Sequence, residues 1–115
     1  MIELLLAFAL LINAERPVDL KPDATLTVRA YVRAYELCEK NQFSHDGWVK
    51  SFEGLKHDGP NYMGENLAKG FNSPSEAHKA LMASPTHKAN IEKPEYTKLG
   101  VAEGSCGVTV FLFSN

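Results

Sequence analysis

Histidine and carboxylate side chains are the groups of this sequence that could carry chemistry. Its four histidines are His45, His57, His78 and His87. Imidazole is the side chain that gains or loses a proton near neutral pH. The sequence contains no HExxH zinc-peptidase helix, no GxSxG nucleophile turn and no GxxxxGK(S/T) phosphate loop. Neither cysteine has the flanking residues of a thiol protease. Chemistry therefore has to come from histidines and carboxylates that the fold brings together.

Taken one at a time, these residues also have ordinary structural interpretations. His78 lies in the middle of an expected helix and is interpreted as solvated, and His57 lies in a Gly- and Asp-rich loop with no evident partner. His87 stands in the first turn of another helix, where its ring can cover that turn. Glu76 occupies the last position of an S-x-x-E capping box that begins at Ser73, which is a sufficient structural reason for a glutamate.

Three segments together carry a stronger signal than any single residue. They are FSHDG at residues 43–47, GENLA at residues 64–68, and Glu76 followed by SPTHKANI at residues 84–91. In this order and spacing they resemble the CAP superfamily, which is named for cysteine-rich secretory proteins, antigen 5 and pathogenesis-related proteins. The resemblance is to its short bacterial SCP-like branch. It covers nearly the whole chain, from NAER at residues 13–16, similar to the family's N-x-x-R, to YTKLGV at residues 96–101.

Several positions depart from that branch. Leu81 stands where the branch usually has tryptophan, and Ser75 stands where it often has the first of two glutamates. The region between His45 and Glu65 is shorter than usual, and the C-terminal end has few of the usual glycine and aromatic residues. These differences concern the wall of the expected cleft, whereas the four site positions are retained.

The resemblance implies a cavity that gathers two histidines and two glutamates, which here are His45, Glu65, Glu76 and His87. Neutral imidazoles bind Zn²⁺, and carboxylates can complete the coordination shell or hold a ring N–H and a bound water. The leading hypothesis is therefore a domain that binds a divalent cation, with zinc as the first choice. A second hypothesis is metal-assisted hydrolysis of peptide or cell-wall material, with Glu65 as the catalytic general base. A third is a lipid-binding or structural protein, including a bacteriophage component.

The apolar run at residues 4–12 has two interpretations. Its nine residues are far fewer than the about 20 that span a bilayer, so no transmembrane span is expected. We interpret the run as part of a buried first helix over residues 2–15, which Pro17 ends. A signal-peptide core is the alternative, because Ala14 suits a cleavage site, although no Lys or Arg precedes the run.

A second helix is expected to place His45 just beyond its end. Asp23 is suited to cap this helix, which would end near residue 41. Its apolar residues fall on one stripe, and Arg29 and Arg33 are expected on the opposite, solvent-facing side. Glycines recur through residues 46–72 and favour loops around a short helix at residues 48–55, so Glu65 is expected in a loop.

The sequence pattern of the C-terminal half predicts two short helices followed by strands. Ser73 and Ser84 each precede a proline and are expected to cap a helix. After Pro94 the pattern becomes extended and predicts a hairpin, and its apolar second strand at residues 108–113 requires helices against the sheet. The expected fold class is α+β. The resemblance specifies a reduced CAP-type α-β-α sandwich with a small antiparallel sheet, as one domain over residues 1–115.

Composition bounds the partners of this domain. The chain has 115 residues and 12.7 kDa, which fits a single domain. It carries 12 Lys and Arg against 14 Asp and Glu, without a basic cluster, so no nucleic-acid partner is expected. Peptide, cell-wall or lipid ligands are the partner classes that the hypotheses name, and the oligomeric state stays open. An extracytoplasmic or secreted location is expected, with virion association as the alternative.

The two cysteines leave a choice between one disulfide bridge and two buried thiols. Cys38 and Cys106 are too few for a disulfide-dense miniprotein and do not form a CxxC pair. Free cysteine is commonly a small core residue, and two thiols are therefore favoured.

Overall fold

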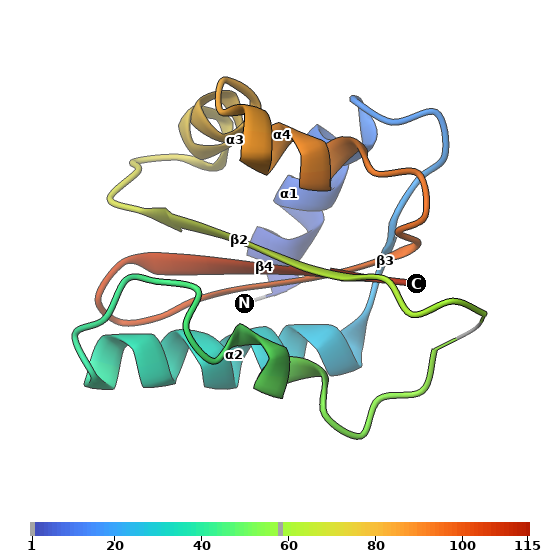
Figure 1. Ribbon diagram of the computed structural model, residues 1–115. Coiled ribbons are helices and arrows are strands. Elements are labelled where there is room, and N and C mark those ends of the chain that lie inside the picture. Colours follow the sequence, from blue (N-terminus) through green and yellow to red (C-terminus); the bar gives the residue numbers. More distant parts are fainter. Residues whose placement is uncertain (1, 58) are drawn as a thin grey trace.

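The computed structural model describes residues 2–57 and 59–115, which form three layers (Figure 1). Helices α1 (Ile2–Asn13), α3 (Pro74–Met82) and α4 (Pro85–Glu92) lie on one face of a sheet. Helix α2 (Ala24–Glu39) and the short 3-10 helix η1 (Trp48–Phe52) lie on the other face. The predicted α+β class and the α-β-α sandwich are confirmed.

Among the described residues the sheet has four strands: β1 (Lys21–Pro22), β2 (Met63–Lys69), β3 (Lys98–Glu103) and β4 (Val108–Ser114). Their order is β1-β3-β4-β2, and β4 pairs antiparallel with both β3 and β2. The predicted hairpin is β3–β4, and every residue of β4 is buried, as expected for a strand covered on both faces.

Two details of the predicted sheet were wrong. The sheet is mixed, because β1 runs parallel to β3. Strand β2 occupies a stretch where only loops were expected, and it carries Glu65. Its Gly, Glu and Asn residues have low strand propensity, yet seven residues of β2 pair with β4. Strand propensity depends strongly on tertiary context. Here the pairing of β2 with β4, a central strand of the sheet, outweighs the low propensity of these residues.

Alternation along the strands divides the interior into two cores. One core lies between the sheet and helices α1, α3 and α4, and its strand residues include Leu99, Val101, Phe111 and Phe113. The other core lies under α2, and its strand residues include Leu67, Ala102, Val110 and Leu112. Because successive side chains point to opposite faces, neighbouring residues of β2 also reach opposite layers.

Helix α1 confirms the interpretation of the apolar run as a helix, and Pro17 follows soon after its end. Phe8 and Ile12 are buried in the core, whereas Leu6 and Leu10 are 48% and 77% exposed. No helix in the described part of the chain has the length and apolar character needed to cross a membrane.

Arg16 links the segment after α1 to the end of α4 through hydrogen bonds. Its guanidinium is buried and donates hydrogen bonds to the carbonyls of Ile91, Lys93 and Tyr96 at 3.0, 2.8 and 2.8 Å. The last carbonyls of a helix lack intrahelical partners, so a cation at this end is favourable. This contact accounts for the arginine of the NAER segment in structural terms.

Helix α2 begins where the sequence predicts and packs closely on the sheet. The Asp23 carboxylate accepts a hydrogen bond from the backbone N–H of Leu26 at 2.8 Å. A β-carbon at Gly100 of β3 would overlap the backbone of Leu26, so the glycine permits this close approach. The predicted apolar stripe is buried, namely Leu26, Ala30, Ala34 and Leu37.

The favoured assignment of the cysteines as two buried thiols was wrong. Cys38 and Cys106 form a disulfide bridge whose Cα atoms lie 5.5 Å apart. The bridge joins the last turn of α2 to the turn between β3 and β4, and Cys106 is exposed. The two residues are 68 positions apart in the chain, so only the packing of α2 on the hairpin brings them together.

Candidate functional site

A chain of three charged or polar side chains links α2, β2 and the loop after α2. Glu65 is on the α2-facing side of β2 and is 6% exposed. Its two carboxylate oxygens accept hydrogen bonds from Arg33 Nε at 2.8 Å and Nη2 at 3.2 Å. His45 Nδ1 lies 2.8 Å from Glu65 Oε1. The buried carboxylate therefore holds a guanidinium on one side and an imidazole on the other.

Arg33 is buried, which corrects its expected place on the solvent face of the helix. It lies three residues after Ala30 and four before Leu37, so it borders the apolar stripe, and this spacing was the signal in the sequence. Its guanidinium also donates to the carbonyls of Ser44 and Asp46 at 2.9 and 3.0 Å. Arg33 thus orders the loop that carries His45.

The His45 ring is held at its inner nitrogen and open at its outer edge. Its side chain is 55% exposed although its partner Glu65 is almost fully buried. A hydrogen bond from Nδ1–H to a carboxylate fixes the tautomer in which Nε2 carries the free lone pair. In this arrangement Nε2 faces away from Glu65 and is available to a ligand.

His87 approaches the same edge of the sheet from the other layer. Its Nδ1 lies 2.8 Å from Ser84 Oγ. Partial burial lowers the pKa of His87, and the positive charge that His45 can carry lowers it further. A neutral imidazole is therefore favoured at this position. The Ser84 side chain does not form the expected capping hydrogen bond with a backbone N–H of α4, because its hydroxyl contacts His87 instead.

Two asparagines and a tyrosine position α4 against β2. Asn66 donates to the carbonyl of His87 at 3.1 Å and accepts from Asn90 Nδ2 at 2.9 Å. The Tyr96 hydroxyl donates to Asn90 Oδ1 at 3.3 Å. Burial raises the pKa of Tyr96, so its hydroxyl stays protonated and keeps donating. A β-carbon at Gly64 would overlap this hydroxyl, which explains the glycine at the start of GENLA.

Glu76 has a different environment from the other three predicted site residues. It lies in the first turn of α3, its side chain is exposed, and its backbone N–H donates to Ser73 Oγ at 3.2 Å. The Ser73 half of the predicted capping box is therefore present. Within the described residues, no hydrogen bond joins the Glu76 side chain to His45, Glu65 or His87.

The other two histidines do not line the pocket beside His45. His78 is 7% exposed, which corrects its interpretation as solvated, and its Nε2 lies 3.4 Å from Glu15 Oε1. It is buried because α3 turns this face toward the segment that follows α1. His57 Nδ1 lies 3.3 Å from the backbone carbonyl of Asn115, a partner that only the folded chain supplies.

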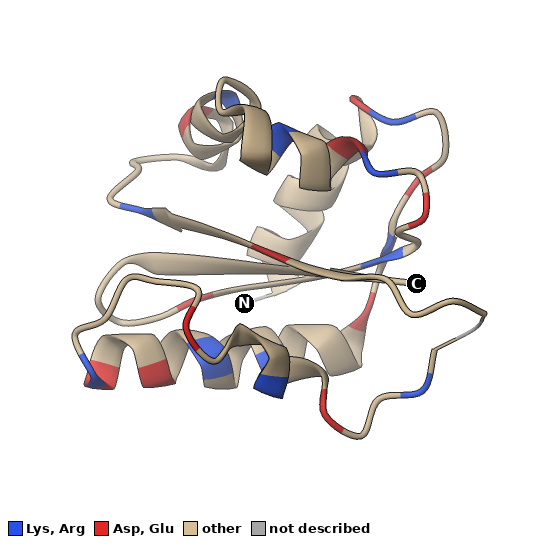
Figure 2. Cartoon of the chain, in the orientation of Figure 1, with Lys and Arg blue, Asp and Glu red and all other residues tan. Residues whose placement is uncertain are grey.

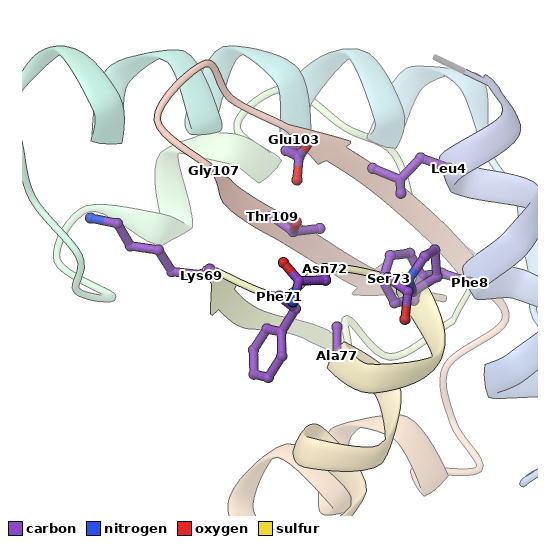
Figure 3. A pocket seen from close by; sticks show the side chains of 12 residues that line it. Leu4, Phe8, Lys69, Phe71, Asn72, Ser73, Ala77, Glu103, Gly107 and Thr109 are labelled. Atoms are coloured by element: carbon purple, nitrogen blue, oxygen red, sulfur yellow. The ribbon is translucent and has the colours of Figure 1, made fainter.

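An open pocket of about 370 Å³ lies beside the His45–Glu65 pair. It combines the hydrogen-bonded His45–Glu65 pair with one aromatic side chain and one amide, and its lining residues are His45, Trp48, Met63, Gly64, Glu65 and Asn90. A second hollow of about 260 Å³ lies where β2 ends and α3 begins (Figure 3). Phe8, Asn72 and Thr109 are among its lining residues, and it includes none of the four predicted site residues.

The predicted ligands do not form an assembled zinc centre among the described residues. Among the described residues, no three His, Cys, Asp or Glu side chains are placed to share one metal ion. His45 Nδ1 and both oxygens of Glu65 are engaged with each other and with Arg33, and a guanidinium beside the carboxylate disfavours a second cation. The tetrad as a metal centre stays a prediction, which a metal titration tests.

Comparisons with known proteins decide the family. The sequence model described as the cysteine-rich secretory protein family, CAP, matches residues 14–114. This chain belongs to the CAP family. The resemblance found in the sequence is thus confirmed. The uncharacterized protein YkwD of Bacillus subtilis is 39% identical over 99 residues, and the match covers 79% of this chain and 38% of YkwD. The chain thus spans less than two-fifths of that relative.

Solved structures show the same fold at low sequence identity. A cysteine-rich secretory protein from Staphylococcus aureus has a TM-score of 0.80 at 16% identity, covering 98% of this chain and 37% of its own. An outer surface protein from Borrelia burgdorferi has a TM-score of 0.79 at 23% identity, and the match covers 98% of this chain and 90% of the Borrelia protein. An extracellular protein containing an SCP domain from Bacillus anthracis has a TM-score of 0.74 at 20% identity. The match covers 98% of this chain and 39% of the Bacillus anthracis protein.

Proposed function

We propose that this CAP domain acts outside a bacterial cell and binds a peptide or cell-wall ligand in the pocket at the edge of β2, through His45. The observation that carries the proposal is the chain Arg33–Glu65–His45. It fixes an imidazole by buried partners while leaving the ring half exposed beside an open pocket. Fixed polar groups in a mostly pre-formed hollow orient a ligand at low entropic cost.

The composition of the pocket supports this ligand class. Trp48 offers an aromatic surface for the apolar face of a sugar or a peptide side chain. Asn90 and His45 Nε2 can exchange hydrogen bonds with amide or hydroxyl groups. Peptides and cell-wall glycopeptides carry both kinds of group, so the pocket suits them better than a purely apolar lipid chain.

Two observations support the location. The relatives from Bacillus anthracis and Borrelia burgdorferi are described as an extracellular protein and an outer surface protein. The disulfide between Cys38 and the exposed Cys106 is of the kind that persists in oxidising compartments. Virion association stays an untested alternative.

The binding proposal is tested by nuclear magnetic resonance titration of the isotope-labelled domain with a panel of short peptides and muropeptides. We expect shifts around Trp48 and Asn90, and a dissociation constant at least about ten-fold higher for His45→Ala, because one fixed hydrogen-bond partner is lost. His57→Ala, outside the pocket, is the matched control. Equal binding by the parent and His45→Ala would contradict the proposal, as would the absence of any shift at the pocket.

Hydrolysis of the same ligand class is a second proposal, favoured by the orientation of His45. A carboxylate that fixes the tautomer of a histidine is a frequent arrangement for general-base catalysis. Glu65 was predicted to be the base, but its burial between Arg33 and His45 favours a positioning role, with His45 Nε2 as the group that meets substrate. Turnover of a muropeptide that His45→Ala abolishes would support this proposal. Turnover that His45→Ala leaves intact would contradict it.

Binding of a divalent cation is a separate proposal that needs its own measurement. Calorimetric titration with zinc compares the parent with the double variant His45→Ala, His87→Ala. A cation site at these histidines requires that the parent bind and the variant fail to bind. Equal heats from both proteins would remove the metal from the function.

A further inference from the structure

Helix α2 presents a second, apolar face to solvent. Val28, Tyr31, Val32 and Tyr35 are 63%, 43%, 50% and 61% exposed. Their spacing of three, one and three residues puts them on one side of the helix, opposite the buried stripe. We call these four residues the α2 stripe. A stripe of this spacing is the pattern by which one helix packs against another.

The position of α2 in the fold leaves the α2 stripe uncovered. Figure 1 shows α2 as the outer layer on its side of the sheet, with η1 beside one part of it. The residues of α2 that face the sheet are Leu26, Ala30, Ala34 and Leu37, and none of these belongs to the stripe. Large apolar residues that gather on one face of a small domain mark an interaction surface, and tyrosine is enriched in such surfaces.

The charges beside the α2 stripe are complementary to those of a second copy of the same helix. Arg29 lies in the N-terminal half of the helix, whereas Glu36 and Glu39 lie in its last turns. Figure 2 shows acidic segments, in red, at this C-terminal end of α2. A second copy of α2 packed antiparallel would place acidic residues beside basic ones at both ends of the contact. The same arrangement brings Glu39 of each copy toward the N-terminus of the other helix, where the helix dipole favours a negative charge.

The register of such a pair follows from the spacing of the stripe. A two-fold axis between Tyr31 and Val32 sets Val28 opposite Tyr35 of the second copy. Arg29 then lies about two residues, or about 3 Å along the helix axis, from Glu36 of the second copy. Both chains make the same contacts, as an isologous dimer requires.

We propose that this CAP domain forms a two-fold symmetric dimer through the α2 stripe, with α2 of one copy antiparallel to α2 of the other. The surface lies on η1's side of the sheet but uses none of the residues that line the pocket beside His45. The variants that test the dimer therefore leave the pocket residues unchanged, and this test is independent of the ligand proposal.

Sedimentation equilibrium of the full chain tests the dimer, over loading concentrations from about 10 µM to about 1 mM. The parent is expected to be a reversible dimer. Val32→Glu, at the centre of the stripe, is expected to raise the dimer dissociation constant at least about ten-fold, since a central contact dominates a small interface. Leu10→Glu, on the exposed face of α1, is the matched control and is expected to leave the dissociation constant unchanged.

A charge exchange tests the antiparallel register without touching the apolar contacts. Arg29→Glu alone and Glu36→Arg alone each place like charges together and are expected to weaken the dimer. An equimolar mixture of the two variants brings opposite charges together at both places, once as in the parent and once with the signs exchanged, and is expected to form the heterodimer. These variants also keep the test valid if Val32→Glu does not fold.

A parent that stays monomeric at the highest concentration would overturn the proposal. A dimer that Leu10→Glu dissociates and folded Val32→Glu preserves would also overturn it and would assign the contact to α1. A mixture of the charge variants that associates no better than either alone would overturn the antiparallel register.

Discussion

The buried carboxylate of Glu65 positions the His45 ring through its hydrogen bond and its pairing with Arg33. A carboxylate with a side chain only 1% exposed requires compensation by an opposite charge and by hydrogen bonds. Arg33 supplies both, and the same guanidinium holds the backbone that carries His45. The orientation of the imidazole thus depends on a residue of α2 that does not line the pocket.

Removal of Arg33 is predicted to destabilise the domain strongly. Arg33→Ala leaves the buried carboxylate of Glu65 without its cation, and breaking a buried pair on one side costs about 3–5 kcal/mol of unfolding free energy. Lys40→Ala, on an exposed lysine after α2, is the control and should change this quantity little. Urea unfolding followed by circular dichroism measures both. Coincident unfolding curves for the two variants would refute the role given to the pair.

His87 is predicted to make stability depend on pH below neutrality. Its pKa in the folded protein is lowered, first by burial and then by the charge of His45. Between that lowered value and the ordinary value near 6.5, the unfolded chain binds more protons than the folded one. The unfolding free energy should therefore rise with pH in this window and fall as the solution is acidified.

Substitution of His87 separates this contribution from the rest of the titration. His87→Gln should reduce the slope of unfolding free energy against pH between about 5 and 7, whereas the control Thr86→Ala, at an exposed α4 residue without a titratable group, should retain the parent slope. Urea unfolding across this range measures the slope. A parent slope that persists in His87→Gln would mean that the protonation of another group governs it.

At the scale of elements, α2 and β2 decide the geometry of the site. Strand alternation turns Glu65 toward α2 and Asn66 toward α4, so one strand edge receives side chains from both layers. Asn66 and Asn90 then hold α4 against β2. His45 and His87 reach this edge from opposite faces of the sheet.

The disulfide joins α2 to the hairpin and is predicted to stabilise the folded domain. The bridge spans 68 positions, and closing a loop of this length in the unfolded chain corresponds to about 4 kcal/mol of unfolding free energy. The double variant Cys38→Ser, Cys106→Ser should lose this amount in urea unfolding. Ser105→Ala, in the same turn, is the control. Equal stability of the double variant and the parent would show that packing alone holds α2 in place.

At the scale of the whole molecule, one sheet separates two cores. The apolar pattern of β4 predicted that both of its faces are covered, and the caps at Asp23 and Ser73 located two helix starts. These features follow from local rules, because periodicity and capping depend on residues close together in the chain. The helices and the C-terminal hairpin were therefore accessible from local patterns, and the family was accessible from the order and spacing of its motifs.

The features that were missed depend on residues far apart in the chain. Arg33 resembles a solvated charge until β2 places a buried carboxylate beside it. Strand β2 itself resembles a loop until β4 pairs with it. Cys38 and Cys106 resemble two free thiols until α2 packs on the hairpin.

The chain by itself determined which residues carry protonatable groups, where its helices begin and which family it resembles. Tertiary structure alone decided which of those groups meet: Glu65 faces Arg33 and His45, while Glu76 remains exposed at the start of α3. The reason is physical, since a local pattern specifies the face of an element on which a side chain lies. Only the packing of layers specifies what that face touches.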